Sequence, residues 1–220
     1  MHVSIPQTEE ELLEKTKVIT GLTLGEMAKN AALLMPSNLL RAKGWIGQLL
    51  ELYLGASAGS RAEPDFQAIG VELKTVPLNH QGRVAETTYV CTAPLLNVGH
   101  LRWEESVVYK KLARVLWVPI TYAEVLAERR IGQPVLWSPT AEQLQTLRMD
   151  WEELMDMITL GQLEKITASY GDALHIRPKA LDARSLTWGV DQDGHKIKTL
   201  PRGFYLRKSF TQEILMLKKG

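Results

Sequence analysis

The stretch that decides the fold is Pro64-Asp65-Phe66-Gln67-Ala68-Ile69-Gly70-Val71-Glu72-Leu73-Lys74-Thr75. In its second half, apolar and charged residues alternate as they do in a β-strand, in which side chains two residues apart share a face. Glu72 and Lys74 are therefore predicted to project together, while Val71 and Leu73 point into a core. Asp65 arrives from the preceding turn, so two carboxylates and one ammonium group are expected at one place.

These residue types suit the hydrolysis of a phosphodiester bond. Mg²⁺ prefers hard oxygen ligands, and one or two carboxylates together with substrate phosphate oxygens commonly hold it. Asp65 and Glu72 are the candidate metal ligands, with the carbonyl of Leu73 as a further one. Lys74 is the candidate for orienting the attacking water or stabilising the transition state. The stretch thus predicts a Mg²⁺-dependent site.

Alternatives remain for each of these residues. Glutamates and lysines are frequent enough in this chain for one Glu-x-Lys triplet to occur by chance, and the site could be a strand edge whose charged face is only solvated. Glu51 adds weight, because an acid within the apolar helix expected at 44–54 is costly to bury unless it is paired or binds a cation. Its alternative is a glutamate at the rim of the helix. Lys43, just before this helix, is a phosphate contact or an ordinary surface lysine.

Composition places the chain among packed globular proteins. It has 220 residues, of which 45% are hydrophobic and 23% charged, so disorder and fibrous repeats are excluded as its general state. No apolar run approaches the roughly 20 residues that cross a bilayer, and the N-terminus lacks the pattern of a secretory signal. Its single cysteine, Cys91, cannot form an internal disulfide. We therefore expect a cytoplasmic protein with no membrane contact. It should form a single domain over residues 1–220 with two lobes, and the composition of the sequence does not show where the boundary between the lobes lies.

Charge is balanced in total but not along the chain. The net charge is +1, which by itself argues mildly against a nucleic-acid partner. Residues 140–172 contain seven acids and two bases, whereas residues 175–220 contain ten bases and four acids. The basic C-terminal part therefore favours an anionic partner.

Helical and strand patterns alternate throughout, which indicates a mixed α/β protein. Thr8 and Thr23, each followed three residues later by glutamate, predict helix starts. Gly55 suits the C-terminal end of the helix at 44–54. Further helices are predicted at 141–160 and 211–218, and strands at 69–76, 87–93, 112–120, 134–137, 173–176 and 204–206. We interpret 69–76 and 87–93 as a hairpin or as two adjacent antiparallel strands.

The sequence gives less support to other kinds of catalytic or metal site than to the acidic site around Asp65 and Glu72. The five histidines are far apart in sequence and do not have zinc spacing, and Cys91 is predicted to be a small core residue. No glycine-rich phosphate loop and no Gly-x-Ser-x-Gly motif occurs.

Several segments resemble one known family. They are KGWIGQLLELYLGASAGSRAEPDFQAIGVELKTVP (43–77), RVLWVP (114–119), DWEELMDMITLGQLEKITA (150–168), IRPKA (176–180) and LPRGFYLRKSF (200–210), and they are similar to the MutH family of DNA mismatch-repair endonucleases. The resemblance implies a restriction-endonuclease-like fold, with a central mixed sheet flanked by helices and two lobes around a DNA cleft. It also implies Mg²⁺-dependent nicking of the unmethylated strand at hemimethylated GATC sites in double-stranded DNA. Activation by MutL, after MutS has found a mismatch, belongs to the same expectation.

The resemblance extends to individual site residues. The family's Asp-x6-Glu-x-Lys pattern falls on Asp65, Glu72 and Lys74, and its helical acid falls on Glu51. Lys111 resembles a basic neighbour of the active site, although it could be a surface lysine. The residues that match DNA-contacting segments are Lys43, Tyr89, Arg177, Pro178, Lys179 and Tyr205. Of these, Tyr89 could equally be a core residue of its strand.

Base recognition has a physical rationale in these residue types. Arginine suits the O6 and N7 acceptors of guanine, and an aromatic or apolar group beside adenine N6 can sense an added methyl group. Two other functions share the same residues: a non-catalytic DNA-binding module, and a GATC restriction endonuclease that cuts both strands. We expect a monomer, and a monomer would favour nicking over double-strand cleavage, because a lone active site reaches one strand per visit.

Overall fold

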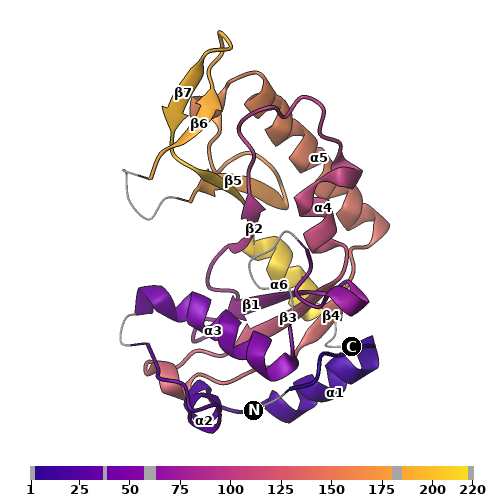
Figure 1. Ribbon diagram of the computed structural model, residues 1–220, viewed down its shortest axis with the longest axis vertical. Helices are drawn as coiled ribbons and strands as arrows, with labels where there is room; N and C mark the ends of the chain where they lie inside the picture. Colours follow the sequence, from indigo (N-terminus) through magenta and orange to yellow (C-terminus); the bar gives the residue numbers. More distant parts are fainter. Residues whose placement is uncertain (1–2, 37–38, 57–62, 180–184, 218–220) are drawn as a thin grey trace. The chain divides into compact units, whose positions relative to one another are not determined.

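The chain forms two compact units in the computed structural model, which describes residues 3–36, 39–56, 63–179 and 185–217, without the side chains of 39–41 and 43 (Figure 1). Unit 1 comprises Met1–Glu86, Ala113–Ser138 and Ile214–Gly220, and unit 2 comprises Thr87–Leu112 and Pro139–Glu213. The chain therefore passes from one unit to the other four times. Helices and strands are mixed in both units, which confirms the expected α/β class.

Unit 1 is built on a three-stranded mixed sheet. Its strands are β1 (Glu72–Pro77), β3 (Val115–Ile120) and β4 (Val135–Trp137), in the order β1-β3-β4. β1 runs parallel to β3, and β4 runs antiparallel to β3. Among the strands of the described residues, β1 therefore has a hydrogen-bonded neighbour on one side only, and its other edge is available to the segments that precede it.

Three helices accompany this sheet: α1 (Glu9–Ile19), α2 (Leu24–Asn30) and α3 (Leu39–Leu54). The predicted caps are present, since the Thr8 hydroxyl accepts the Glu11 N–H and Thr23 forms a reciprocal capping box with Glu26. α3 ends at Gly55, whose φ of 80° is in the left-handed region. A Cβ there would lie 2.5 Å from the carbonyl oxygen of Ser4, so glycine is also required for space.

The core of unit 1 fixes α3 against β1. Buried apolar side chains of α3 join those of the sheet and of the segment before it, and they include Leu49, Leu50, Phe66, Val71 and Leu116. This packing determines which side of α3 faces β1, and hence where Glu51 lies.

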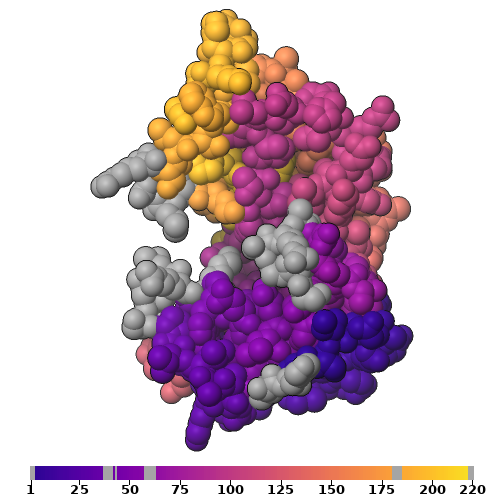
Figure 2. Space-filling view, in the orientation of Figure 1, coloured from indigo at the N-terminus to yellow at the C-terminus, as the bar shows by residue number. Residues whose placement is uncertain are grey.

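Unit 2 contains a second sheet, of strands β2 (Thr88–Thr92), β8 (Arg202–Leu206) and β5 (Leu174–Pro178), antiparallel and in the order β2-β8-β5. Its helices are α4 (Val107–Leu112), α5 (Ala141–Thr159) and α6 (Lys208–Met216), the last residues of α6 being assigned to unit 1. A hairpin of β6 (Thr187–Val190) and β7 (Lys196–Thr199) projects at the top of Figures 1 and 2. Short 3-10 helices lie at Gln67–Ile69, Trp103–Glu105, Leu126–Glu128 and Leu163–Lys165.

Three expectations about strands are wrong. The segments at 69–76 and 87–93 do not pair with each other, since β1 pairs with β3 and β2 pairs with β8. The strand expected from residue 112 begins at Val115, because residues 107–112 complete a helical turn. β1 itself starts at Glu72, after a 3-10 turn that ends in Gly70 at a φ of 66°.

Within the described ranges, no helix combines the length and the apolar character needed to cross a membrane.

Candidate active site

The open edge of β1 binds the side chain of Asp65. The N–H of Glu72 donates to the carbonyl of Arg114, just before β3, at 2.9 Å. In a β-strand the next amide points the other way, and the N–H of Leu73 indeed donates to Asp65 Oδ2 at 2.8 Å. The N–H and C=O of one residue lie on the same side of a strand, so the Leu73 carbonyl lies along this open edge too. Asp65 is only 8% exposed.

Glu72 and Lys74 share a face of β1, as the alternation predicts. Lys74 Nζ lies 2.5 Å from Glu72 Oε1. The Glu72 residue is 2% exposed, and Lys74 is largely covered as well. A solvated strand edge is therefore the wrong interpretation of these charges, because neither side chain extends freely into water.

Glu51 completes a group of three interacting carboxylates. It lies on α3 and is half-buried. Burial raises the pKa of Glu51, the negative charges of Asp65 and Glu72 raise it further, and the Lys74 ammonium acts in the opposite direction. The repulsion that Glu51 experiences reports an excess of negative charge in this part of unit 1.

This donor set fits a divalent cation. Carboxylates and a backbone carbonyl are the hard oxygen ligands that Mg²⁺ prefers, and a cation would relieve the repulsion around Glu51. Asp65, Glu72, Glu51 and the Leu73 carbonyl remain the predicted ligands.

Unit 2 gathers most of the residues predicted to contact DNA on one sheet. Tyr89 on β2 is opposite Tyr205 on β8, and their rings make an edge contact with centroids 5.3 Å apart. His175 on β5 is opposite Tyr205 on its other side, at 6.4 Å between rings. Burial raises the pKa of Tyr205, and Tyr89 adds to this, so the Tyr205 hydroxyl keeps its proton at neutral pH.

The basic predicted residues extend from the same sheet. Arg177 follows His175 by two residues on β5, and its Nη1 donates to the Thr87 hydroxyl at 3.1 Å. Pro178 ends β5 and is exposed. Lys179 comes next, and its ammonium lies 4.2 Å from the centroid of the Tyr89 ring. Tyr89 is partly exposed, so it is not the core residue of the alternative interpretation.

For two predicted residues the structure gives the element but not the contacts that would define a role. Lys111 lies in α4, in unit 2, whereas Asp65, Glu72 and Lys74 are in unit 1. Lys43 lies within α3, but its side chain is outside the described part of the structure. Their roles stay predictions.

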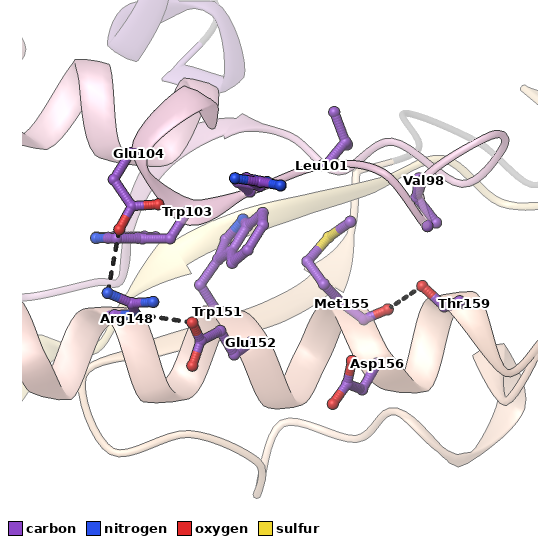
Figure 3. Close-up of a pocket in the computed structure, with 12 residues that line it drawn as sticks. Val98, Leu101, Trp103, Glu104, Arg148, Trp151, Glu152, Met155, Asp156 and Thr159 are labelled. Carbon is purple, nitrogen blue, oxygen red and sulfur yellow. Dashed lines mark hydrogen bonds and ion pairs between the residues drawn. The ribbon is translucent and has the colours of Figure 1, made fainter.

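A cavity of about 590 Å³ in unit 2 was not anticipated from the sequence. Figure 3 shows Trp151 and Met155 pointing from α5 toward the segment that contains Val98 and Trp103. Arg148 at its rim pairs with Glu104 at 3.1 Å and with Glu152 at 2.8 Å. Two of the three carboxylates among its described lining residues thus have an internal partner, and none of the predicted site residues whose side chains are described lines the cavity.

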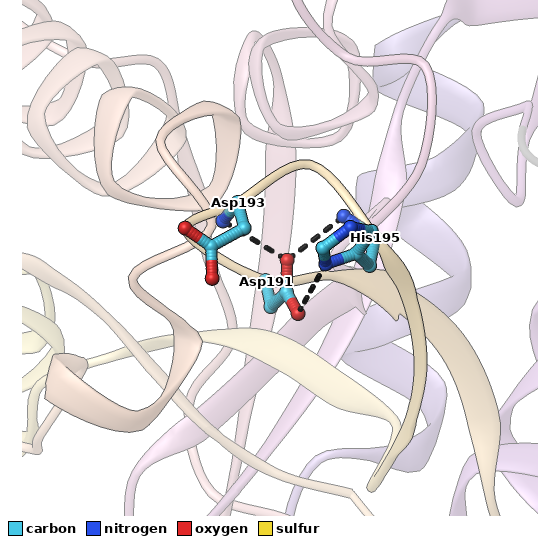
Figure 4. A group of neighbouring side chains, drawn as sticks. All are labelled: Asp191, Asp193 and His195. Atoms are coloured by element: carbon cyan, nitrogen blue, oxygen red, sulfur yellow. Dashed lines mark hydrogen bonds and ion pairs between the residues drawn. The ribbon is translucent and has the colours of Figure 1, made fainter.

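The turn of the β6–β7 hairpin brings together Asp191, Asp193 and His195 (Figure 4), a group that could hold a metal ion. The Asp191 carboxylate accepts the N–H groups of Asp193 at 3.0 Å and of His195 at 2.8 Å. These bonds are those of an aspartate that stabilises a turn, and Gly194 takes the left-handed conformation beside it. Turn formation therefore accounts for the cluster.

The chain is similar to known proteins of DNA mismatch repair. A family model described as DNA mismatch repair enzyme MutH matches residues 54–150. Over 215 residues the chain is 56% identical to the DNA mismatch repair protein MutH of Escherichia coli O127:H6 (strain E2348/69 / EPEC), covering 97% of this chain and 94% of that protein. The MutH proteins of E. coli O6:K15:H31 (strain 536 / UPEC) and O1:K1 / APEC are each 55% identical with the same coverage.

The chain belongs to the MutH family. The family has a restriction-endonuclease-like fold, so the expected fold class is confirmed. The part matched by the MutH family model contains Asp65, Glu72 and Lys74, and the similarity to whole MutH proteins extends over nearly the whole chain, unit 2 included. The protein is thus an enzyme of DNA mismatch repair.

Proposed function

We propose that this MutH-family protein is a Mg²⁺-dependent endonuclease that nicks the unmethylated strand of hemimethylated GATC sites. The observation that supports it most is the group at β1, where the buried Asp65 and Glu72 carboxylates lie with the Lys74 ammonium, and where burial and these two negative charges raise the pKa of Glu51. Perturbed, interacting acids of this kind are typical of sites that bind metal and phosphate.

Each residue of the group has a definite task in this proposal. Asp65, Glu72, Glu51 and the Leu73 carbonyl hold the metal. When bound, Mg²⁺ supplies a water of lowered pKa and neutralises charge that develops on the phosphate. The bond from Leu73 N–H fixes the orientation of the Asp65 carboxylate. Lys74 is held beside Glu72, from where its ammonium orients the attacking water or stabilises negative charge in the transition state.

Nicking of a plasmid that contains GATC sites tests the catalytic assignment. Asp65→Ala, Glu72→Ala and Lys74→Ala should each lower the nicking rate by at least about 100-fold, a typical loss for a group that stabilises the transition state. Glu63→Ala is the matched control, because Glu63 is an exposed acid two residues before Asp65. Retained nicking in all three variants with Mg²⁺ present would refute the assignment.

The same assay separates the competing functions. A non-catalytic DNA-binding module would bind the plasmid without any metal-dependent cleavage. A restriction endonuclease would cut both strands of unmodified GATC, whereas the proposed enzyme cuts one strand of a hemimethylated site. Counting the cut strands on hemimethylated duplexes therefore decides between them.

We assign sequence and methylation recognition to unit 2. Tyr205 is the proposed sensor of adenine N6, and Arg177 and Lys179 lie on the same face of the sheet as Tyr205, whereas Pro178 alternates to the other face and is an exposed candidate contact at the end of β5. Tyr205→Ala should reduce discrimination between hemimethylated and fully methylated duplexes more than it reduces affinity. Equal losses on every duplex would contradict this role.

The proposed cellular setting follows from the family. It comprises a cytoplasmic monomer that MutL activates after MutS has detected a mismatch. Weak nicking by the protein alone is therefore expected, and addition of MutL, MutS and a mismatched duplex should raise the rate.

A further inference from the structure

Lys179 is held by its neighbours more firmly than an exposed lysine usually is. Its ammonium donates to the Tyr89 hydroxyl at 2.5 Å and to the Thr92 hydroxyl at 3.1 Å. Those two hydroxyls also hydrogen-bond each other at 3.0 Å. The Tyr89 ring lies under the ammonium at 4.2 Å, in a cation–π contact. The backbone N–H of Lys179 is fixed as well, by the carbonyl of Pro201 at 2.7 Å.

A β-bulge in β2 creates this arrangement. Tyr89 pairs with Tyr205 and Cys91 pairs with Phe204. Between these two pairs the register advances by two residues on β2 but by only one residue on β8, which is a β-bulge. In a regular strand, Tyr89 and Thr92 are three residues apart and would point to opposite faces. The extra residue brings both hydroxyls to the same face, where Lys179 meets them.

Gly203 provides the room for the Tyr89 ring. It is opposite Thr92 on β8, and a Cβ at this position would lie 2.9 Å from Tyr89 Cε2 and 3.1 Å from Tyr205 Cε2. Any side chain there would displace the two rings. We call Tyr89, Thr92 and Gly203 the lysine socket.

The lysine socket fixes direction without removing charge. A lysine ammonium has three N–H donors, and the two hydroxyls accept two of them. Hydroxyl groups and an aromatic ring are uncharged, so none of these contacts is an ion pair. The direction of the third N–H is therefore fixed. A contact to phosphate does not need a fixed direction, but discrimination between base edges does.

We propose that Tyr89 and Thr92 are positioning residues that direct one N–H of Lys179 to an acceptor atom on a base edge of the recognition site. This inference rests on the proposed function, in which unit 2 recognises DNA sequence. The matching acceptors in the major groove are guanine O6 and N7, adenine N7 and thymine O4, whereas cytosine N4 and adenine N6 present donors that would repel the ammonium.

The test compares affinities for a hemimethylated GATC duplex and for a duplex of equal length with the four bases changed. Tyr89→Phe removes one hydroxyl and Thr92→Val the other, while Thr92→Ser restores it and Tyr109→Phe serves as the control. Tyr109 is in the same unit and packs edge-on against Trp103 at 5.5 Å. Tyr89→Phe and Thr92→Val should each reduce the ratio of the two affinities by about 3- to 10-fold, as the loss of one hydrogen bond predicts.

Several further results are expected together. Affinity for the changed duplex and its salt dependence should match those of the unmodified protein, because no phosphate contact is removed. Thr92→Ser and Tyr109→Phe should retain the full ratio. Lys179→Met should reduce the ratio, and adding Tyr89→Phe to it should cause no further loss. Independently of DNA, ¹⁵N NMR should show a slowly exchanging Lys179 ammonium that exchanges faster in Tyr89→Phe.

Specific outcomes overturn the inference. An unchanged ratio in both hydroxyl variants, while Lys179→Met loses discrimination, would refute the socket but leave the proposed function intact. A further loss from Tyr89→Phe in the Lys179→Met background would show that Tyr89 does not act through Lys179. Equal losses on both duplexes with a weaker salt dependence would make Lys179 a phosphate contact. Absence of any GATC preference in the unmodified protein would instead refute the proposed function, and the inference with it.

Discussion

Asp150 on α5 is a buried carboxylate whose replacement by asparagine should destabilise unit 2. It is 6% exposed and accepts three backbone N–H groups from the segment that leads into β5. Asp150 Oδ1 accepts from Asp172 at 2.9 Å, and Oδ2 accepts from Ala173 and Leu174 at 2.7 Å each. This carboxylate thus fastens the start of β5, the strand of His175 and Arg177, to α5.

The expected magnitude follows from the hydrogen bonds. Asparagine has one acceptor oxygen, which can keep the two bonds at the Oδ2 position. Its NH₂ group would then face the Asp172 N–H, donor against donor. One buried donor left without an acceptor costs about 1–3 kcal/mol, and the two remaining bonds lose the strengthening that a charged acceptor gives. We expect Asp150→Asn to lower the free energy of unfolding by about 2–4 kcal/mol.

Urea unfolding at neutral pH measures this difference. Asp156→Asn is the matched control, because Asp156 lies on the same helix and is exposed, so its replacement should change stability by less than about 0.5 kcal/mol. Asp150→Ala, which removes all three acceptors, should be less stable than Asp150→Asn. If Asp150→Asn is as stable as the unmodified protein, the three bonds do not contribute as argued.

Three further predictions concern the two sites. Burial and like charges raise the pKa of Glu51, so this carboxyl holds a proton more readily in the folded protein than in the unfolded chain, and it lowers stability as the pH rises above the usual glutamate range. Glu51→Gln should therefore raise the melting temperature in EDTA at pH 7 and reduce the stabilisation by Mg²⁺. If neither value changes, this argument is contradicted. Burial and the charges of nearby arginines lower the pKa of His175, so the unfolded state takes up a proton at this residue before the folded state does. Below about pH 6.5, the pKa of histidine in an unfolded chain, acid should therefore destabilise the protein by at most about 1.4 kcal/mol per pH unit. The urea midpoints at pH 7 and pH 5 should differ more for the unmodified protein than for His175→Phe. Gly203→Ala should cost less than about 2 kcal/mol of stability, since the rings of Tyr89 and Tyr205 are partly exposed and can shift, yet it should abolish preferential binding of GATC duplexes, and a retained preference would show that ring placement is unimportant.

Local sequence signals were sufficient for much of the fold. The helix caps at Thr8 and Thr23, the apolar spacing of α5 and the shared face of Glu72 and Lys74 depend on residues a few positions apart, and the structure contains all three. A threonine just before a helix accepts an N–H of the first turn through its side chain, as both Thr8 and Thr23 do. Such features need no knowledge of the rest of the chain.

Strand pairing was not accessible in the same way. β1 pairs with β3 and β2 pairs with β8, and in both cases the partner is much farther along the chain than the neighbour expected. Alternation shows that a segment is a strand and which side is apolar, but many segments satisfy the same condition. The choice of partner depends on packing across the whole unit, which one short pattern does not contain.

The proposed functional sites show the same difference between local sequence signals and long-range pairing. The grouping of Asp65, Glu72 and Lys74 was predictable because these residues are close in sequence, although the bond from Leu73 N–H to Asp65 was not. The lysine socket depends on a bulge and on a glycine from another strand, and neither has a sequence signature. Charge counting also treated Asp150 like its acidic neighbours, whereas its charge is used inside unit 2.

The four passages of the chain between units have a consequence for synthesis. Unit 1 receives residues from the beginning, middle and end of the chain, and unit 2 occupies the two stretches between them. On the ribosome, β1 emerges before the segment that supplies its partner β3, and unit 2 must wait for β8 to complete its sheet. Neither unit can therefore finish folding as a nascent chain until nearly all of the protein has been made. For the same reason, no truncation from either end yields one intact unit, and separating them requires cutting the gene at internal positions and rejoining the pieces with linkers.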